Sequence, residues 1–430
     1  MKYDIVKNSR EDALLSAASS ELQEDIQPFE GKFPKAEQVA WLGCLPRPLL
    51  SWYDEEKRIL PWRENTDPYR VWVSEIMLQQ TRVEAVKEGY VRFLSVLPDL
   101  KSLAEAPEEL LMKLWEGMGY YSRARNLQKA ARIALATWGG LPASVEKLRS
   151  LPGIGDYTAG AVASIAFGIP APAVDGNVLR VLARLLNSSR DVLEPAAKKE
   201  AEALLRPIIP KDRAGDFTQA LMELGALICV PGSPRCEACP VSSLCLGFKA
   251  GTASGLPVKK SKKARRVEER TVFLLITPRG KVALEKRPSK GLLAGMWQLP
   301  NAEGRLSREQ GRRLWEEKGF FVEQTQKLPR AVHIFSHIEW HMTGIALFLR
   351  GEPPAEKADG DRRQSDAQRG WREEKKLRQS ESATLVWASL EELRTEKALP
   401  AAFRAYRKAF EEIVEKGPTE DEPEQLMLPV

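Results

Sequence analysis

The chain has 430 residues, of which 43% are hydrophobic and 29% are charged, so it can form two or three domains with substantial cores. Its formal net charge of +6 is a modest positive balance that suits an anionic partner. No apolar run approaches the roughly twenty residues of a membrane span, and the first residues lack the apolar core of a secretion signal, which argues against membrane and secreted proteins.

Residues 1–44 are polar and lack a clear hydrophobic period, so we expect a flexible N-terminal extension there. Between residues 45 and 228, apolar residues recur at helical spacing, as in 71–78 and 83–97. No alternating strand pattern occurs before residue 250. The first domain is therefore predicted to be all-α.

One predicted helix in this domain carries a potential acid. The segment 72–81 (WVSEIMLQQT) places Glu75 early in a helix among apolar neighbours. Burial would raise the pKa of its carboxyl group, as a general acid near neutral pH requires. The alternative is a solvent-facing glutamate that complements the dipole of the first helical turn. Gln79 and Gln80 could hydrogen-bond base edges or fill a vacated base position, or they are ordinary surface residues.

The segment 115–125 (WEGMGYYSRAR) combines Gly119 with Tyr120, Tyr121 and two arginines. Aromatic and basic side chains on a glycine-rich loop suit stacking on bases and holding of phosphate. The alternative is an elbow between two helices with both tyrosines in the core.

Residues 148–184 contain a helix-hairpin-helix pattern. The turn Pro152-Gly153-Ile154-Gly155 separates two helices, and both glycines can adopt positive φ and let a phosphate approach the N–H groups of the second helix. Such a hairpin grips a nucleic-acid backbone without reading bases. The later sequence 174–177 (VDGN) places Asp175 at the N-cap of the next helix. Taken singly, these features also fit a plain helix turn and a plain cap.

Four of the five cysteines lie close together, and Cys44 stands apart. Structural zinc usually takes two Cys-x2-Cys pairs, and the cluster has only one such pair, so zinc fits poorly. Four thiolates in one compact loop suit a [4Fe-4S] cluster. The sequence therefore predicts an iron–sulfur loop over residues 229–245, with the ligands Cys229, Cys236, Cys239 and Cys245.

The order of these motifs resembles the endonuclease III superfamily of helix-hairpin-helix DNA glycosylases. The resemblance rests on 60–63 (LPWR), the helix at 74–81, the hairpin, the VDGN sequence and the cysteine loop, and it covers about residues 45–250. Within the superfamily, the chain is similar to the enzymes that remove adenine mispaired with 8-oxoguanine or guanine in double-stranded DNA. The resemblance implies base excision repair by a monomeric enzyme.

The resemblance also implies roles for individual residues. Glu75 would protonate N7 of adenine, Asp175 would stabilise or capture the oxocarbenium sugar, and Tyr157 and Asn177 would support that site. Gln80 and Tyr120 would wedge into the duplex. The full set expected to contact DNA or the base comprises Arg58, Trp62, Arg63, Gln79, Gln80, Thr81, Gly119, Tyr120, Tyr121, Gly153, Gly155, Phe335, Ser336 and His337.

One position separates two chemistries within the superfamily. Bifunctional members carry a lysine in the second hairpin helix, which attacks the sugar and cleaves the strand through a Schiff base. This chain has Tyr157 there, and no lysine lies between Lys147 and Lys198. We therefore expect two carboxylates to hydrolyse the N-glycosidic bond of a flipped adenine without strand cleavage, as in the retaining glycosidase scheme.

Residues 246–270 are predicted to form a basic interdomain linker, because six of the eight residues from Lys259 to Arg266 are basic. We expect this run to lie near phosphate. After it the pattern changes to strands at 271–277, 281–287, 343–349 and 385–388, with helices at 307–318 and 401–415. The second domain, 271–415, is therefore predicted to be α+β.

The second domain resembles the Nudix fold, and residues 312–320 resemble a degraded Nudix box. Arg313 stands where the box has a metal-binding glutamate, and Gly304 stands at the upstream glutamate position. Because a cation cannot ligate Mg²⁺, we do not expect Nudix hydrolysis. Residues 333–337 (HIFSH) are instead similar to the loop that meets 8-oxoguanine in the adenine-specific enzymes. The alternative is an ordinary strand edge whose histidines cap their neighbours.

Two further segments remain. Residues 352–383 are charged and poor in apolar residues, so we expect a disordered insertion. The tail at 416–430 contains Gln425 to Leu428 (QLML), which resembles the peptide by which bacterial repair proteins dock on the sliding clamp. These features favour a bacterial cytoplasmic protein associated with the nucleoid.

Two hypotheses from different classes are thus open. The first is a monofunctional adenine glycosylase, with a strand-cleaving lyase as a lesser variant. The second is a non-catalytic iron–sulfur protein that binds damaged duplexes and recruits partners. Only the first requires Glu75 and Asp175 to lie close together in one groove.

Overall fold

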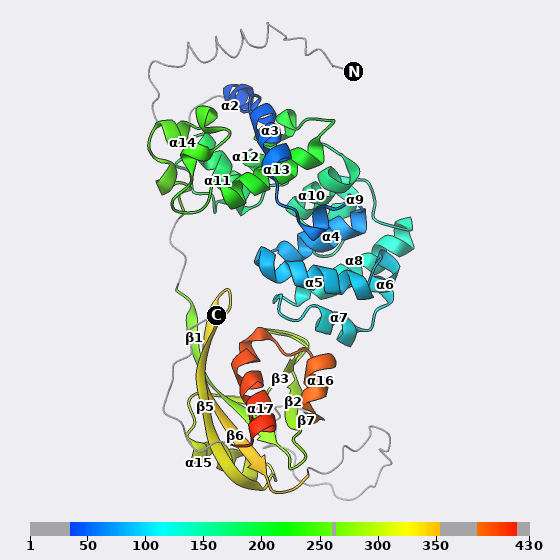
Figure 1. Cartoon of the computed structure of the whole chain (residues 1–430), viewed down its shortest axis with the longest axis vertical. Helices are drawn as coiled ribbons and strands as arrows, with labels where there is room; N and C mark the ends of the chain where they lie inside the picture. Colours follow the sequence, from blue (N-terminus) through cyan, green and yellow to red (C-terminus); the bar gives the residue numbers. More distant parts are fainter. Residues whose placement is uncertain (1–34, 260–263, 353–384, 419–430) are drawn as a thin grey trace, which may run out of the picture. The chain divides into compact units, whose positions relative to one another are not determined.

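A computed structural model describes residues 35–259, 264–352 and 385–418. They divide into two compact units (Figure 1). The helical unit comprises the described residues up to 104 and those from 126 to 262. The mixed unit comprises residues 105–125 and the described residues from 263 onward. No described helix is long and apolar enough to cross a membrane.

The helical unit has no strand among its described residues, as the sequence predicts. Helix α8 begins inside the 105–125 segment and continues into this unit. Its helices are α2 (Lys35–Leu42), α3 (Pro46–Glu56), α4 (Pro68–Leu78), α5 (Val83–Val96), α6 (Leu100–Glu105), α8 (Ser122–Trp138), α9 (Val145–Arg149), α10 (Asp156–Phe167), α11 (Gly176–Leu185), α12 (Pro195–Leu205), α13 (Ala214–Leu227) and α14 (Leu246–Lys249). Single 3-10 turns are η1 (Pro61–Arg63), η2 (Arg206–Ile208), η3 (Cys236–Ala238), η4 (Ser242–Leu244) and η5 (Ala253–Gly255).

Helix α10 lies at the centre of the helical unit and packs against both α4 and α13. Its small residues allow this close approach. A Cβ on Gly160 would lie 2.0 Å from the backbone oxygen of Pro172, and a Cβ on Gly215 of the neighbouring α13 would lie 2.9 Å from Cα of Ile165. Since α10 follows the hairpin turn, the turn is anchored on a rigid core.

The first helices of the chain return to pack beside the later ones, as the dark blue and green ribbons of Figure 1 show. Helix α3 packs against α13, and α2 packs against α12. Leu42, Leu45 and Leu49 share one core with Val181 of α11 and Leu221 of α13. The prediction of a flexible extension to residue 44 is therefore wrong for residues 35–44, because Leu42 is buried and Val39 and Trp41 pack against the same core. Residues 1–34 lie outside the described residues.

The mixed unit is built on one sheet with strand order β3-β2-β1-β6-β5, to which β4 pairs on β1 and β7 on β2. Strands β1 and β6 run parallel, from Arg266 opposite Ile338 to Ile276 opposite Phe348. The strands are β1 (Arg266–Ile276), β2 (Val282–Lys286), β3 (Trp297–Gln298), β4 (Asn301–Glu303), β5 (Val322–Ile334), β6 (Ile338–Leu349) and β7 (Leu385–Ala388). The helical elements are α7 (Glu108–Leu114), α15 (Arg308–Glu316), α16 (Leu390–Thr395), η6 (Ala401–Phe403) and α17 (Arg404–Lys416).

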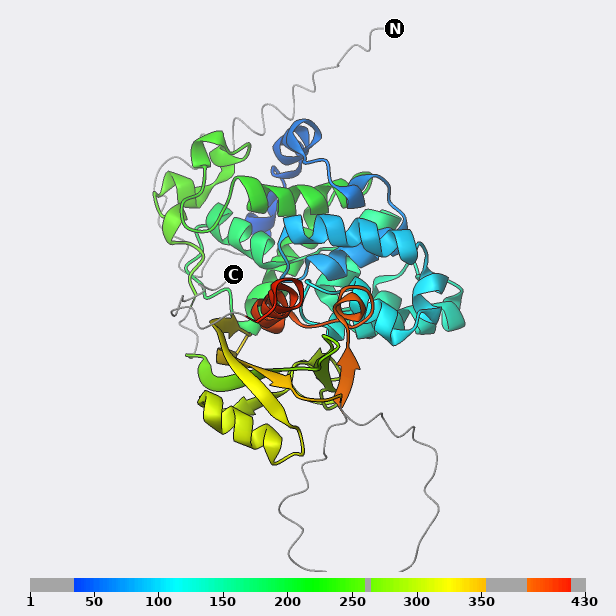
Figure 2. The same cartoon turned by 60° about the horizontal axis from the view of Figure 1, so that its bottom comes forward.

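Side chains alternate along β1 between two cores, as the two-residue period of a strand requires. Val272 and Leu274 join the core under α17, which includes Phe410. Phe273 joins the opposite core with Trp315 of α15. Figure 2 shows α15 and α17 on opposite sides of the sheet. The predicted α+β class is confirmed, although the sequence patterns did not indicate β3, β4 or the long, largely polar β5.

The predicted bounds of the linker, 246–270, are wrong at both ends. At its start, α14 and η5 pack onto the helical unit, where Leu246, Ala253 and Leu256 are buried. At its end, β1 already begins at Arg266. Single buried side chains and backbone hydrogen bonds hold the start of this stretch on the helical unit. Such isolated contacts leave no periodic pattern of apolar residues in the sequence.

The other boundary difference is the 105–125 segment, which we expected in the helical domain and which packs with the sheet instead. The proposed insertion lies outside the described residues apart from residue 352, and so does the tail from residue 419.

Candidate active site

A buried carboxyl group lies on α4, as the sequence predicts. The helix begins after Asp67, whose side chain accepts a hydrogen bond from the backbone N–H of Arg70. Glu75 lies near the end of this helix rather than early in it, and it is only 6% exposed. The expected position was wrong because the helix starts at Pro68, before the apolar run. The predicted burial is confirmed.

The phenol of Tyr157, in the first turn of α10, donates a hydrogen bond of 2.6 Å to Oε2 of Glu75. Burial raises the pKa of Glu75 to about 7, and the negative charge of Asp175 acts in the same direction. The Tyr157 hydrogen bond and the charge of Arg63 oppose this rise. Glu75 is therefore close to half protonated at neutral pH, which suits a general acid.

Asp175 is the N-cap of α11, as predicted. Its Oδ1 accepts from the backbone N–H of Val178, and its Oδ2 accepts from Nδ2 of Asn177, both at 2.8 Å. Burial raises the pKa of Asp175, while these hydrogen bonds act to lower it. Each hydrogen bond favours the ionised form, and the N-terminus of the helix does the same. The structure thus combines one carboxyl suited to hold a proton with another suited to be an anion.

Asn177 also connects this carboxylate to the cysteine loop. Nη2 of Arg180 donates to Oδ1 of Asn177 at 2.8 Å, and Nε of Arg180 donates to the backbone oxygen of Cys229 at 2.7 Å. The orientation of Asn177 that supports Asp175 is therefore fixed from both sides.

Glu223 is a residue of this region that sequence analysis missed. It lies on α13 with its side chain 1% exposed, and it pairs with Arg58 at 2.8 Å and with Arg63 at 2.9 Å. Although burial opposes ionisation, the hydrogen bonds from Arg58 and Arg63 lower the pKa of Glu223 to about 2. Its signal in the sequence is a single acid in the apolar run of α13 (FTQALMELGAL).

The ion pairs of Glu223 hold Arg58 and Arg63 in place, the two arginines that the sequence assigned to DNA contact. Both are held by a buried carboxylate, and Arg63 is close enough for its charge to lower the pKa of Glu75. Trp62, assigned to the same role, is buried and packs edge-on against Tyr90, with ring centroids 5.7 Å apart.

The residues that follow α4 lie against the hairpin helix. Nε2 of Gln79 donates to Oγ1 of Thr158 at 3.1 Å, and Oγ1 of Thr81 donates to the carbonyl of Gln79 at 3.3 Å. Gln80 adopts a left-handed backbone, with φ of 56°, which few residues other than glycine favour. The turn thus holds Gln79 at the start of α10 and constrains Gln80.

The hairpin forms between α9, which is N-capped by Ser144, and α10. Gly153 has φ of 78°, but Gly155 has φ of −93° and is the N-cap of α10. The expectation of positive φ at both glycines is therefore wrong for Gly155, since an N-cap residue is extended. No atom lies within 4 Å of where a Cβ of Gly155 would be, so an anion can approach the backbone N–H groups there.

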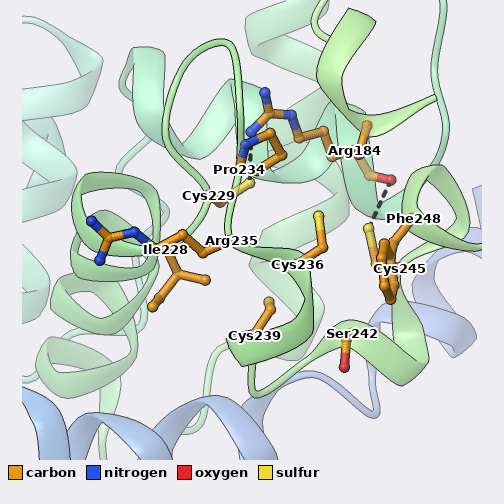
Figure 3. Close-up of a pocket in the computed structure, with 11 residues that line it drawn as sticks. Arg184, Ile228, Cys229, Pro234, Arg235, Cys236, Cys239, Ser242, Cys245 and Phe248 are labelled. Carbon is orange, nitrogen blue, oxygen red and sulfur yellow. Dashed lines mark hydrogen bonds between the residues drawn. The ribbon is translucent and has the colours of Figure 1, made fainter. Parts of the chain in front are cut away.

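The four clustered cysteines line one pocket together with Arg184 (Figure 3). Nη1 of Arg184 donates to Sγ of Cys229, and Sγ of Cys245 donates to the backbone oxygen of Arg184, both at 3.3 Å. Burial raises the pKa of Cys239 to about 12 and that of Cys245 to about 11. Among the described residues, no three side chains converge closely enough to hold a single metal ion. The thiols instead surround a shared space.

The predicted recognition loop is the turn of a hairpin. His333 and Ile334 end β5, and β6 begins at Ile338. Phe335 packs between His333 and Trp340, with centroids 4.5 and 5.0 Å away. The next two residues, Ser336 and His337, are exposed.

Tyr120 reaches this turn within the mixed unit, and the hydroxyl groups of Tyr120 and Ser336 are 2.9 Å apart. Gly119 and Tyr120 have φ of 64° and 46°, so the backbone of this loop is left-handed at two consecutive residues. Tyr121 does not join them, because it is buried at 5% exposure. Its burial fits the alternative of a core tyrosine, and its assignment to DNA contact stays a prediction without support from this structure.

The degraded Nudix box forms α15, which Ser307 begins with a capping box. Arg313 forms an ion pair of 2.9 Å with Glu309 on the same helix, and Trp315 is buried against the sheet. Arg313 itself offers no carboxylate oxygen for Mg²⁺ at this position, and the carboxylates of Glu309 and Glu316 on the same helix are paired with arginines.

Comparison with known proteins agrees with this arrangement. Residues 73–211 match the family of HhH-GPD superfamily base excision DNA repair proteins, and residues 271–409 match the NUDIX domain. The chain is 36% identical to the adenine DNA glycosylase of Homo sapiens over 393 residues, which cover 77% of this chain and 71% of the relative. It is 38% identical to that of Rattus norvegicus over 375 residues, 74% of this chain and 73% of the relative. A solved thermostable thymine-DNA glycosylase is 30% identical with a TM-score of 0.44, over 50% of this chain and 98% of that one. The chain belongs to the adenine DNA glycosylase family, whose members remove adenine in base excision repair.

Proposed function

We propose that this enzyme hydrolyses the N-glycosidic bond of adenine paired with 8-oxoguanine or guanine, without cutting the strand. The observation that supports this most directly is the pair of Glu75 and Asp175: Glu75 is buried with its pKa raised to about 7, and the half-buried Asp175 accepts hydrogen bonds from Val178 and Asn177 that favour its ionised form. Two titratable groups in such different environments are suited to the roles of acid and anion.

In this mechanism Glu75 donates its proton to N7 of adenine, and the electrons of the glycosidic bond leave with the base. The sugar becomes an oxocarbenium ion, which the carboxylate of Asp175 stabilises or captures. Water then adds to the sugar carbon and returns one proton to the solvent. Tyr157 keeps Glu75 in place through its 2.6 Å hydrogen bond, and Asn177 orients Asp175.

The test is single-turnover release of adenine from A·8-oxoguanine, A·G and G·T duplexes. Asp175→Asn should keep duplex binding and lose release, because the amide cannot stabilise a cation. Glu75→Gln should behave likewise, since it has no proton of suitable acidity to give. If the wild type binds these duplexes and releases no adenine, the alternative of a DNA-binding scaffold would replace the proposal. If both variants release adenine at the wild-type rate, other residues carry the chemistry and the roles given to Glu75 and Asp175 are wrong.

The lack of strand cleavage is proposed from the sequence around the hairpin. Tyr157 is engaged with Glu75 and is not an amine, and the stretch from Lys147 to Lys198 contains no lysine between its ends. Borohydride should therefore trap no covalent complex with the substrate duplex. A trapped complex would show that an amine elsewhere serves as a nucleophile.

We further propose that Cys229, Cys236, Cys239 and Cys245 hold a [4Fe-4S] cluster. Their thiols line one pocket, and four thiolates from one short loop suit a [4Fe-4S] cluster. The cluster would carry thiolate ligands and redox-capable iron. Nη1 of Arg184 donates to Sγ of Cys229 at 3.3 Å, so a cation lies beside the proposed ligands. Iron content and visible absorption of the purified protein test this assignment.

The remaining proposals concern DNA. The open N-cap of α10 at Gly155 supports a phosphate contact, the constrained Gln80 supports insertion into the duplex, and the exposed Ser336 supports contact with 8-oxoguanine. The clamp-like peptide 425–428 lies outside the described residues. Deletion of 425–430 should abolish capture by the sliding clamp if that peptide is used.

A further inference from the structure

The 105–125 segment is fixed to the helices that cover the sheet. Oε1 of Glu116 accepts a hydrogen bond of 2.8 Å from Nη1 of Arg407 on α17. Nζ of Lys113 donates to the backbone oxygen of Leu393 on α16 at 2.9 Å. These contacts join residues separated by 291 and 280 positions in the chain. They hold α7 and the loop after it on the C-terminal part of the fold.

Glu116 is the central residue of this attachment. Its other oxygen accepts from Nζ of Lys113 at 2.6 Å, so one carboxylate joins two cations. The side chains of Glu116, Lys113 and Arg407 are only 18%, 14% and 25% exposed. Water and salt screen such a half-buried network less than a surface pair. It can therefore hold geometry more firmly than an exposed pair.

Helix α17 supports the 335–337 turn as well. Phe403, the residue before α17, packs on Trp340 with ring centroids 6.2 Å apart, and Trp340 packs on Phe335 at 5.0 Å. Tyr406 of α17 lies so close to β6 that a Cβ on Gly344 would be 2.3 Å from its ring. The turn and the 105–125 segment thus rest on the same helix.

These two attachments meet where Tyr120 contacts Ser336. Between Glu116 and Tyr120 the backbone is preset, because Gly117, Gly119 and Tyr120 have φ of 91°, 64° and 46°. The contacts of Glu116 thus lie only four residues before the phenol that meets Ser336.

We propose that Glu116 and Arg407 are positioning residues for recognition of the base opposite adenine, acting by holding Tyr120 against Ser336. This inference rests on the proposed function, in which the 335–337 turn contacts 8-oxoguanine. Neither residue touches the carboxyl pair that carries the chemistry. Their loss should therefore reduce the preference for 8-oxoguanine over guanine while leaving adenine release from A·G intact.

The experiment measures single-turnover adenine release from A·8-oxoguanine and A·G duplexes at substrate concentrations below saturation. The variants are Glu116→Gln, Arg407→Gln and the double variant. Glu411→Gln is the matched control, because Glu411 pairs with the other face of Arg407 at 3.4 Å and does not touch the 105–125 segment. Each single variant should lower the ratio of the two rates by roughly 3- to 10-fold. The double variant should lower it no further, since both changes break one interaction.

Arg407→Lys retains the charge and should retain most of the ratio, so it is the conservative counterpart of Arg407→Gln. An unchanged ratio, additive losses in the double variant, or an equal fall on both duplexes would overturn the inference. If the wild-type protein releases adenine from neither duplex, the proposed function fails, and the inference fails with it. If the wild type releases adenine equally from both duplexes, the proposed contact of the 335–337 turn with 8-oxoguanine fails, and so does the inference. If the preference is present and survives both substitutions, only the inference fails.

Discussion

Replacement of Glu75 by glutamine should stabilise the protein at alkaline pH. Burial raises the pKa of this carboxyl from 4.5 to about 7 in the folded state, so between these values the folded protein binds more protons than the unfolded chain. The free energy of unfolding must then fall as the pH rises from about 4.5 to about 7, and remain lower above that. At about 1.4 kcal/mol per pH unit, the ionised Glu75 costs about 3 kcal/mol of stability at pH 8.

The glutamine variant removes this cost, because its side chain is neutral at every pH and its amide oxygen can still accept from Tyr157. We expect the Gln variant to be about 3 kcal/mol more stable than the wild type at pH 8 and similar to it near pH 5. Urea unfolding followed by far-ultraviolet circular dichroism measures both. Contributions from titrating groups that do not interact with Glu75 cancel in the difference between variants.

Glu55→Gln is the control, since Glu55 is exposed on α3. Its stability should follow that of the wild type across the same pH range. Parallel curves for Glu75→Gln and the wild type would refute the reasoning, because they would mean that burial does not hold the proton on Glu75.

Further predictions follow from individual contacts. Adenine release should fall as the pH rises above about 7, where Glu75 loses its proton; a rate constant through pH 9 would contradict the assigned acid. Tyr157→Phe removes a hydrogen bond that lowers the pKa of Glu75, so this fall should move to higher pH, and an unmoved profile would argue against the contact. Gly160→Ala would place a Cβ 2.0 Å from a backbone oxygen, so it should lower the free energy of unfolding by at least about 2 kcal/mol. Gly176→Ala is the control: its Cβ would meet nothing within 4 Å, so it should retain the wild-type melting temperature. Glu223→Gln leaves two arginines without their counter-charge and should lower the free energy of unfolding by about 3 kcal/mol at pH 7; because the pKa of Glu223 is depressed to about 2, this difference should shrink as the pH falls from about 4.5 through 2.

Local motifs were readable in the sequence because their chemistry depends on neighbours along the chain. Asp175 caps α11 through the N–H of a residue three positions later. The glycine at 153 has the left-handed backbone that a hairpin turn requires. The four cysteines fall within seventeen residues, from 229 to 245, and their shared pocket follows from that short loop.

Other features could not be read because they depend on distant parts of the chain. Glu223 is 165 positions from Arg58, so nothing local marks it as an ion-pair partner. Tyr120 and Tyr121 are adjacent in the sequence, yet one is 47% exposed and the other is 5% exposed. Only packing decides which of two neighbouring tyrosines faces solvent. The same applies to β5, whose polar residues pair as a strand because β6 offers it a partner.

The sequence by itself determined the class of each half of the chain, the position of the hairpin and the presence of two acids in the helical half, since periodicity and turn chemistry are local. The tertiary structure decided that Tyr157 links α10 to Glu75 across 82 positions, that Glu223 anchors two arginines, and that residues 105–125 pack with the sheet. These outcomes depend on which surfaces bury one another, a property of the whole fold rather than of any single segment.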